Sequence, residues 1–284
     1  MDTEPSGALV RAFLDEGAVR LLLVEATAPA ARTREVHDLG PDAARIGAES
    51  LVAAALNAAY IKGDEQLAFQ LSGQKPACSV YADVTAEGAI RARVAPPDLA
   101  LEDGRLRGML VAIKSLGGKE LYRGITEVPG TTIEEALGAH LDASTQVDDV
   151  LRIGIKQGAD GEILQAGGLL LERMPEERGQ ASLEPEAFEA RYGWVREADV
   201  LQVLTQLAFG TLGDRRIQVL EQRALVWRCR CSRERSETAL LALGADTLQE
   251  MIAEDHGAEV SCDFCQATYA FDEAELGAIR ARVA

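Results

Sequence analysis

Four of the five cysteines lie in the last fifth of the chain, in two closely spaced pairs. Cys229 and Cys231 form a CxC motif, Cys262 and Cys265 form a CxxC motif, and thirty residues lie between the two motifs. Thiolates are good ligands for Zn²⁺, and a tetrahedral site with Zn–S bonds of about 2.3 Å places its sulfurs about 3.8 Å apart. An extended segment points residues i and i+2 to one side, and a tight turn brings the ends of a CxxC together. The spacing therefore predicts one zinc site with these four cysteines as ligands.

Four arginines surround the CxC motif: Arg228, Arg230, Arg233 and Arg235. Nearby positive charge lowers the pKa of a thiol and favours the thiolate, which binds metals and is easily oxidised. Each disulfide formed among the four thiols removes two ligands from the metal. Two interpretations follow from these residues, a closed zinc site that only stabilises a fold and a metal site that acts as a redox switch.

The residues between and after the cysteine pairs must fold back to close such a site. Thr247 and Glu250 have capping-box spacing, which predicts a helix that ends near Gly257. Two further helices are expected, one from about Ser236 to Gly244 and one that starts at Asp272 with Glu275 as its capping partner. A module of about 55 residues has little core of its own. Zinc binding, at about 10–16 kcal/mol for structural sites, is therefore expected to supply much of its folding free energy.

Upstream, the pattern of apolar residues predicts helices and strands without a regular βαβ repeat. Residues 41–60 have the spacing of a long core helix, and residues 131–141 form a second helix with Thr132 and Glu135 as a capping box. Strict alternation predicts a β-hairpin over residues 78–94, and the further strand-like runs are 106–113, 150–155 and 163–171. This order favours an α+β fold over a doubly wound parallel sheet.

A polar stretch that begins at Pro175 and Glu176 ends this pattern and indicates a domain boundary. The expected organisation is an amino-terminal α+β domain over residues 1–175, a mostly helical linker over residues 176–225, and a zinc-binding domain over residues 226–284. Within the linker, Asp199 is expected to cap a helix whose apolar stripe is formed by Leu201, Leu204, Leu207 and Ala208. Such a stripe must pack against another part of the protein.

Composition narrows the classes of function. The chain of 284 residues has 47% hydrophobic and 26% charged residues, as in an ordinary globular protein, and a formal charge of −17. That acidity argues against binding to nucleic acid or to anionic membranes. The longest apolar stretch, residues 51–60, is half of what a membrane span needs, and we expect no secretory signal, because the first residues have no basic segment followed by an apolar core. We expect a cytoplasmic protein with reduced thiols.

The cysteine region is similar to a known family in more than its cysteines. The residues that carry this similarity are the run Val226 to Arg235, the stretch Leu240 to Met251, the stretch Gly257 to Val260, and Phe264 inside the CxxC motif. Weaker matches upstream are Gly63 to Glu65, Tyr122 to Gly124 and Ala166 to Leu170. The order of CxC, about thirty residues and CxxC resembles the 33-kilodalton heat-shock protein family, the bacterial redox-regulated holdase chaperones.

The resemblance implies a mechanism. By this resemblance, the reduced form with one Zn²⁺ per chain is expected to be inactive, and oxidants are expected to form Cys229–Cys231 and Cys262–Cys265 disulfides. Zinc would then leave, the zinc domain would unfold and the linker would be destabilised. The exposed apolar surface holds unfolding client proteins without ATP, and oxidised subunits form homodimers.

The remaining candidate residues receive structural interpretations. Cys78 is expected to be a small buried thiol, and Trp194 and Trp227 are expected to be core anchors. The three histidines, His37, His140 and His256, are isolated, and four cysteines already complete a zinc tetrahedron. No phosphate-binding loop and no Ser-His-Asp series is visible, so we expect neither an enzyme nor a nucleotide-binding protein.

Two other functions use similar motifs. A thiol-disulfide oxidoreductase would use the CxxC pair, but that motif usually occurs in a thioredoxin-like βαβ context, whereas Phe264 lies in a strand-turn setting. A zinc-ribbon adaptor for nucleic acid would use both pairs, but residues 229–284 contain eleven acidic and five basic side chains.

Overall fold

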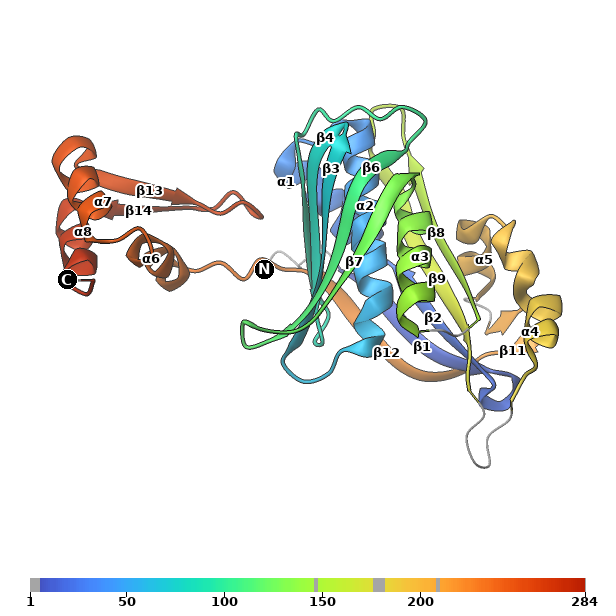
Figure 1. The fold of residues 1–284 in the computed structure, drawn as a ribbon. Helices are drawn as coiled ribbons and strands as arrows, with labels where there is room; N and C mark the ends of the chain where they lie inside the picture. The colour runs from blue at the N-terminus through green and yellow to red at the C-terminus, as the bar shows by residue number, and fades with distance from the viewer. Residues whose placement is uncertain (1–5, 146–147, 176–181, 208–209, 284) are drawn as a thin grey trace. The chain divides into compact units, whose positions relative to one another are not determined.

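The computed structural model describes residues 6–145, 148–175, 182–207 and 210–283. The chain forms two compact units, Met1–Arg228 and Cys229–Ala284, and both contain helices and strands (Figure 1). The predicted α+β class is therefore confirmed. The division lies close to residue 226, where the zinc-binding domain was expected to begin. Among the described residues, no helix has both the length and the apolar character needed to cross a membrane.

The first unit is built on a ten-stranded sheet with the strand order β7-β6-β3-β4-β5-β12-β1-β2-β9-β8. Its strands are β1 (Ser6–Leu14), β2 (Val19–Glu25), β3 (Glu65–Lys75), β4 (Ala77–Thr85), β5 (Ala89–Ala95), β6 (Leu106–Leu116), β7 (Lys119–Thr131), β8 (Asp149–Gln157), β9 (Ile163–Arg173) and β12 (Gln218–Trp227). The predicted hairpin is β4 and β5, which pair antiparallel, and β6, β8 and β9 contain the other predicted strands.

Two half-sheets meet at a narrow junction. Strands β5 and β12 pair in parallel at two positions only, Val226 with Ala89 and Trp227 with Ile90. The indole Nε1 of Trp227 donates to Thr33 Oγ1 at 3.1 Å, and Trp227 is 8% exposed. Trp227 is therefore the core anchor that the sequence predicts.

Three helices cover one face of the sheet. They are α1 (Thr27–His37), α2 (Pro41–Asn57), which continues into the 3-10 turn η2 (Ala58–Tyr60), and α3 (Ile133–Thr145). Helix α2 is buried along nearly its whole length, as its alanine-rich sequence predicts. The capping box of α3 is also confirmed, because Glu135 N donates to Thr132 Oγ1 and Thr132 N donates to the Glu135 carboxylate.

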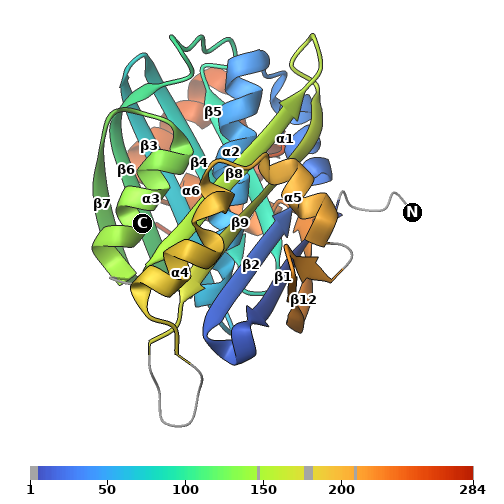
Figure 2. The same ribbon diagram turned by 90° about the vertical axis from the view of Figure 1, so that its right-hand side faces the viewer.

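A second core lies on the opposite face of β1, β2, β9 and β8. Adjacent residues of paired strands point to opposite cores: Leu22 and Leu170 join the first, Leu21 and Leu171 the second. A strand that is covered on both faces has apolar residues at consecutive positions, which explains why Leu169, Leu170 and Leu171 are all apolar. Figure 2 shows α4 (Pro185–Tyr192) and α5 (Val200–Leu207) over this face, joined by the 3-10 turn η3 (Gly193–Arg196).

The predicted linker, residues 176–225, is thus helical in its first part, and its described residues pack within the first unit. Asp199 caps α5 as predicted, because Leu201 N donates to Asp199 Oδ1 at 3.0 Å. Leu207 is buried, and Leu201 and Leu204 pack against the second core. Residues 176–181, where the linker was expected to begin, and Ala208 lie outside the described residues.

The second part of the predicted linker is not helical. After the two short strands β10 (Thr211–Leu212) and β11 (Arg215–Arg216), residues 218–225 belong to β12. Strand β12 pairs antiparallel with β1, from Ser6 opposite Val226 to Phe13 opposite Gln218. The hydrogen bonds of this ladder join residues more than 200 positions apart, so local sequence spacing does not reveal them.

The second unit combines short helices with one hairpin. Its elements are α6 (Arg233–Leu241), α7 (Ala245–Glu250), the π-helical turn η4 (Met251–Asp255), β13 (Gly257–Ser261), β14 (Thr268–Asp272) and α8 (Glu273–Arg280). Asp272 and Glu275 form the predicted capping box of α8. The predicted box of Thr247 and Glu250 is wrong, because the positive φ of Gly244 redirects the chain and α7 already begins at Ala245.

Candidate metal centre

The CxC motif lies in the irregular segment between β12 and α6. Cys229 and Cys231 follow the end of β12 at Trp227, and Ser232 then caps α6 by accepting a hydrogen bond from Arg235 N. The extended backbone of Ser232, with φ −153° and ψ 165°, fits the extended segment expected for a CxC pair. The end of the strand and the cap of the helix hold the two cysteines from both sides.

The CxxC motif forms the turn between β13 and β14. Cys262 N donates to Ala267 O and Gln266 N donates to Cys262 O, both at 2.9 Å. Gln266 has a φ of 60°, which closes the turn and directs the chain into β14. Cys262 and Cys265 therefore belong to a fixed hairpin turn and not to the first turn of a helix.

These two segments bring all four sulfurs together. The four Sγ atoms lie within 4.8 Å of one another, and all four cysteines are half-buried. Cys229 Sγ is 3.5 Å from Cys262 Sγ, and Cys231 Sγ is 3.3 Å from Cys265 Sγ. A ZnS₄ tetrahedron has sulfurs about 3.8 Å apart, so the chemistry and the spacing of this donor set fit a thiophilic metal ion.

Hydrogen-bond donors from the hairpin approach two of the sulfurs. Phe264 N donates to Cys262 Sγ at 3.4 Å, and the Tyr269 hydroxyl donates to Cys231 Sγ at 3.3 Å. The bond to Cys231 raises the pKa of Tyr269 to about 12, so its hydroxyl keeps its proton at neutral pH. Such outer contacts orient ligands and tune their charge.

Two of the arginines near the CxC motif interact with other groups of the second unit. Arg233 donates to Glu275 Oε1 at 2.6 Å, and its guanidinium lies 4.3 Å from the ring centroid of Phe271. Arg235 donates to the carbonyl of Arg230 at 2.7 Å. Burial raises the pKa of the Cys265 thiol in the CxxC motif.

The other residues selected from the sequence do not belong to the sulfur cluster. His256 Nδ1 lies 2.7 Å from Glu273 Oε1, so this side chain has a carboxylate partner. Cys78 is half-buried in β4, where burial raises the pKa of its thiol. Trp194 is 45% exposed, so the prediction that it anchors a core is wrong; its indole Nε1 donates to Arg191 O at the surface of η3.

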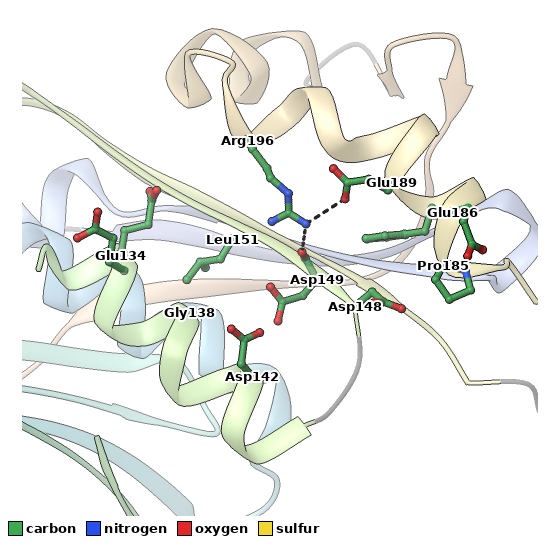
Figure 3. A pocket seen from close by; sticks show the side chains of 12 residues that line it. Glu134, Gly138, Asp142, Asp148, Asp149, Leu151, Pro185, Glu186, Glu189 and Arg196 are labelled. Carbon is green, nitrogen blue, oxygen red and sulfur yellow. Dashed lines mark hydrogen bonds and ion pairs between the residues drawn. The ribbon is translucent and has the colours of Figure 1, made fainter. Parts of the chain in front are cut away.

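The sequence does not reveal an acidic cleft of about 690 Å³ in the first unit. Carboxylates of α3, β8 and α4 line it, including Glu134, Asp142, Asp149 and Glu189, with Arg196 at one side (Figure 3). These residues are far apart in sequence, and no spacing signal connects them. Among the described residues, the four cysteines are the group of His, Cys, Asp or Glu side chains close enough to share a metal ion.

A sequence model described as Hsp33 protein matches residues 7–272. The chain belongs to the Hsp33 family. The 33 kDa chaperonin of Citrifermentans bemidjiense is 32% identical over 297 residues, which cover 97% of each chain. The 33 kDa chaperonin of Bacillus subtilis is 29% identical and covers 96% of this chain and 97% of its own. Hsp33 is thus a family of chaperones.

A solved Hsp33 structure has the same fold. The crystal structure of the 33 kDa chaperonin from Thermotoga maritima superposes with a TM-score of 0.78 and covers 99% of both chains. Its sequence identity is 24%, so this comparison supports the fold alone. It agrees with the α+β architecture of both units.

Proposed function

We propose that this protein is a redox-regulated holdase chaperone that works without ATP. In the reduced state, Cys229, Cys231, Cys262 and Cys265 bind one Zn²⁺ per chain, and the chaperone is inactive. After oxidation the protein binds unfolding or oxidatively damaged client proteins and prevents their aggregation. The observation that carries this proposal is the convergence of four cysteine sulfurs within 4.8 Å in a member of a chaperone family.

The redox step forms two disulfides, Cys229–Cys231 and Cys262–Cys265. For each bond, two thiolates lose two electrons, and one hydrogen peroxide molecule takes up these electrons and two protons to give two water molecules. Oxidation of the whole site consumes two peroxide molecules. Because the thiolate is the form that ligates metal, each disulfide removes two of the four ligands.

Zinc, when bound, supplies a crosslink between the CxC segment and the hairpin turn. The second unit needs such a crosslink because its apolar core is small. Its described residues include five buried apolar side chains. They are Leu240, Leu248, Phe271, Leu276 and Ile279. A unit of this size with so small a core depends on an additional constraint. We infer that loss of the metal unfolds the second unit.

The client-binding surface in this proposal comes from the linker and the sheet beneath it. Helix α5 covers apolar residues of β8 and β9 with its own buried residues Val200, Val203 and Leu207. Strand β12 ends two residues before Cys229, so unfolding of the second unit acts on the linker along the chain. Release of α4 and α5 would expose both apolar surfaces, and exposed apolar surface binds unfolded chains.

The partners in this proposal are unfolding proteins and, after oxidation, a second copy of the chain. We place the protein in the cytoplasm, where thiols are kept reduced until an oxidant is present. The charge of −17 supports the solubility of a chaperone–client complex. Nucleic acid, membranes and nucleotides have no role in the proposal.

The two alternative functions have less support. A thiol-disulfide oxidoreductase needs an attacking CxxC pair, whereas Cys262 and Cys265 lie in a hairpin turn with two further sulfurs beside them. A nucleic-acid adaptor needs positive charge, and the second unit contains eleven acidic and five basic side chains.

The test compares reduced, zinc-loaded protein with peroxide-treated protein in a light-scattering assay of a heat-unfolding client. We expect the oxidised protein alone to suppress aggregation, and dithiothreitol with zinc to reverse the effect. Cys262→Ser should lose this redox dependence. Cys78→Ser is the matched control, because its thiol lies in β4 of the first unit and should leave the switch unchanged. Oxidised protein that does not affect aggregation would rule the proposal out.

A further inference from the structure

One side chain outside the cysteine motifs contacts the sulfur cluster through a hydroxyl group. Tyr269 lies on β14 opposite Val260 of β13, and its hydroxyl is 3.3 Å from Cys231 Sγ. Its ring is partly buried against the core of the second unit. Phenylalanine at this position could therefore keep the packing of the ring. It would remove the hydrogen bond from the hydroxyl to Cys231 Sγ.

The hydroxyl connects the two cysteine motifs. Cys231 comes from the CxC segment, whereas Tyr269 comes from the strand that follows the CxxC turn. The bond that Cys262 accepts is different, because its donor is the backbone of Phe264 in the same turn. A side-chain donor can be removed without any change to the backbone, so the contribution of the Tyr269 bond can be measured.

The chemistry of this bond depends on the state of the sulfur. A hydrogen bond stabilises a thiolate more than a neutral sulfur, because the acceptor carries a full charge. The same bond withdraws electron density and lowers the nucleophilicity of the sulfur toward an oxidant. A disulfide sulfur is neutral and gains less from this donor. The bond thus favours the ligand state of Cys231 over its oxidised state.

We propose that Tyr269 is a positioning residue that holds Cys231 as a metal ligand and slows the oxidation of the Cys229–Cys231 pair. This inference rests on the proposed function. In this proposal the hydroxyl sets how much oxidant is needed to oxidise the switch. Removal of the hydroxyl should change the rate of formation of the two disulfides to different extents.

The test uses the full chain with Tyr269→Phe. Outer contacts to metal ligands typically change metal affinity by about 10- to 100-fold, and we expect a loss of zinc affinity at the lower end of this range in chelator competition on the reduced protein. We also expect peroxide to oxidise the Cys229–Cys231 pair about 3- to 10-fold faster, which corresponds to the net contribution of one hydrogen bond of ordinary strength. The Cys262–Cys265 pair should change less, as measured by mass spectrometry of alkylated peptides.

Tyr122→Phe is the matched control, because Tyr122 is a 45% exposed tyrosine on β7 of the first unit. Circular dichroism and zinc stoichiometry of the reduced protein report whether Tyr269→Phe still folds. If it does, and zinc affinity and both oxidation rates equal those of the wild type, the inference is wrong while the proposed function stands. If wild-type protein keeps zinc as its thiols disappear, the proposed function fails, and chelator competition still decides the role of Tyr269.

Discussion

Gly154 of β8 packs directly against Val200, the first residue of α5. A Cβ atom on Gly154 would collide with Val200 Cγ1 and would lie 3.0 Å from Leu201 Cγ. Val200 is buried, and a β-branched side chain has little freedom to turn away. Helix α5 can therefore lie close to the sheet only because this position has no side chain.

Gly154→Val is expected to displace α5 without any oxidation. The reduced variant should bind a hydrophobic dye and suppress client aggregation in part, because the apolar face beneath α5 is uncovered. Light scattering and dye fluorescence of the reduced protein measure this effect. Gly138→Ala is the control, since a Cβ there meets nothing within 4 Å in α3 and alanine favours the helix. Equal behaviour of the two variants would refute the covering role of α5.

Arg152 forms hydrogen bonds to the turn that leads into α5. Its Nη1 donates to the carbonyls of Val195 at 3.1 Å and Ala198 at 3.0 Å, and its Nε lies 3.2 Å from Glu134 Oε1. A hydrogen bond from a charged donor contributes about 1.5–3 kcal/mol. Arg152→Met should therefore accelerate hydrogen exchange over residues 195–207 by at least about tenfold.

The control for this prediction is Arg123→Met. Arg123 pairs with Glu120 on exposed positions, where such a pair contributes about 0–1 kcal/mol. Exchange over residues 195–207 should not change in this variant. Unchanged exchange in Arg152→Met as well would mean that packing alone holds α5.

The sequence predicted the local features of the fold better than the long-range ones. The helix 41–60, the hairpin 78–94 and the capping boxes at Thr132 and Asp272 depend on residues close in sequence, and all are present. Strand β12 was missed because its ladder with β1 joins the two ends of the first unit.

The candidate site divides in the same way. The convergence of the four cysteines was predicted because the CxC and CxxC spacings allow the two sulfurs of each pair to point toward one metal ion. The contact of Tyr269 with Cys231 was missed, since only the pairing of β13 with β14 brings position 269 beside the cluster. Trp194 was expected in a core because aromatic residues usually are, but η3 turns it to the surface.

Asp149 is expected to make the stability of the first unit depend on pH. Burial, followed by the negative charges of Asp142 and Glu172, raises the pKa of Asp149 to about 6 (Figure 3). A raised carboxyl pKa means that the folded state holds the proton more tightly than the unfolded state. The stability contributed by the protonated form is therefore complete below the unfolded pKa near 3.8 and is lost as the pH rises to about 6.

Asp149→Asn removes this titration. The variant should melt at a higher temperature than wild type at pH 7–8, and the difference should disappear as the pH approaches 4. Thermal melts of the first unit within the intact chain, followed by circular dichroism across this pH range, measure it. A difference that is the same at pH 4 and pH 8 would show that Asp149 acts through packing and not through its charge.

Leu248 tests how far the second unit depends on metal. It is fully buried in a core of few side chains, so Leu248→Ala should lower the free energy of unfolding of the second unit by about 2–5 kcal/mol. Metal binding contributes more than this, at about 10–16 kcal/mol. The variant should fold with zinc but lose it at a lower chelator concentration. Leu243→Ala, at a 47% exposed position, is the control and should behave as wild type.

The central claim is that disulfide formation, zinc release and chaperone activity are one linked event. Zinc in solution, free thiols and scattering from a heat-unfolding client should be followed together during peroxide treatment of the reduced protein. We predict that one zinc per chain leaves as four thiols disappear, with both disulfides within their motifs, and that suppression of scattering rises with zinc release. Zinc that stays bound, or that leaves without any gain in suppression, would contradict the account and leave a site that only stabilises the second unit.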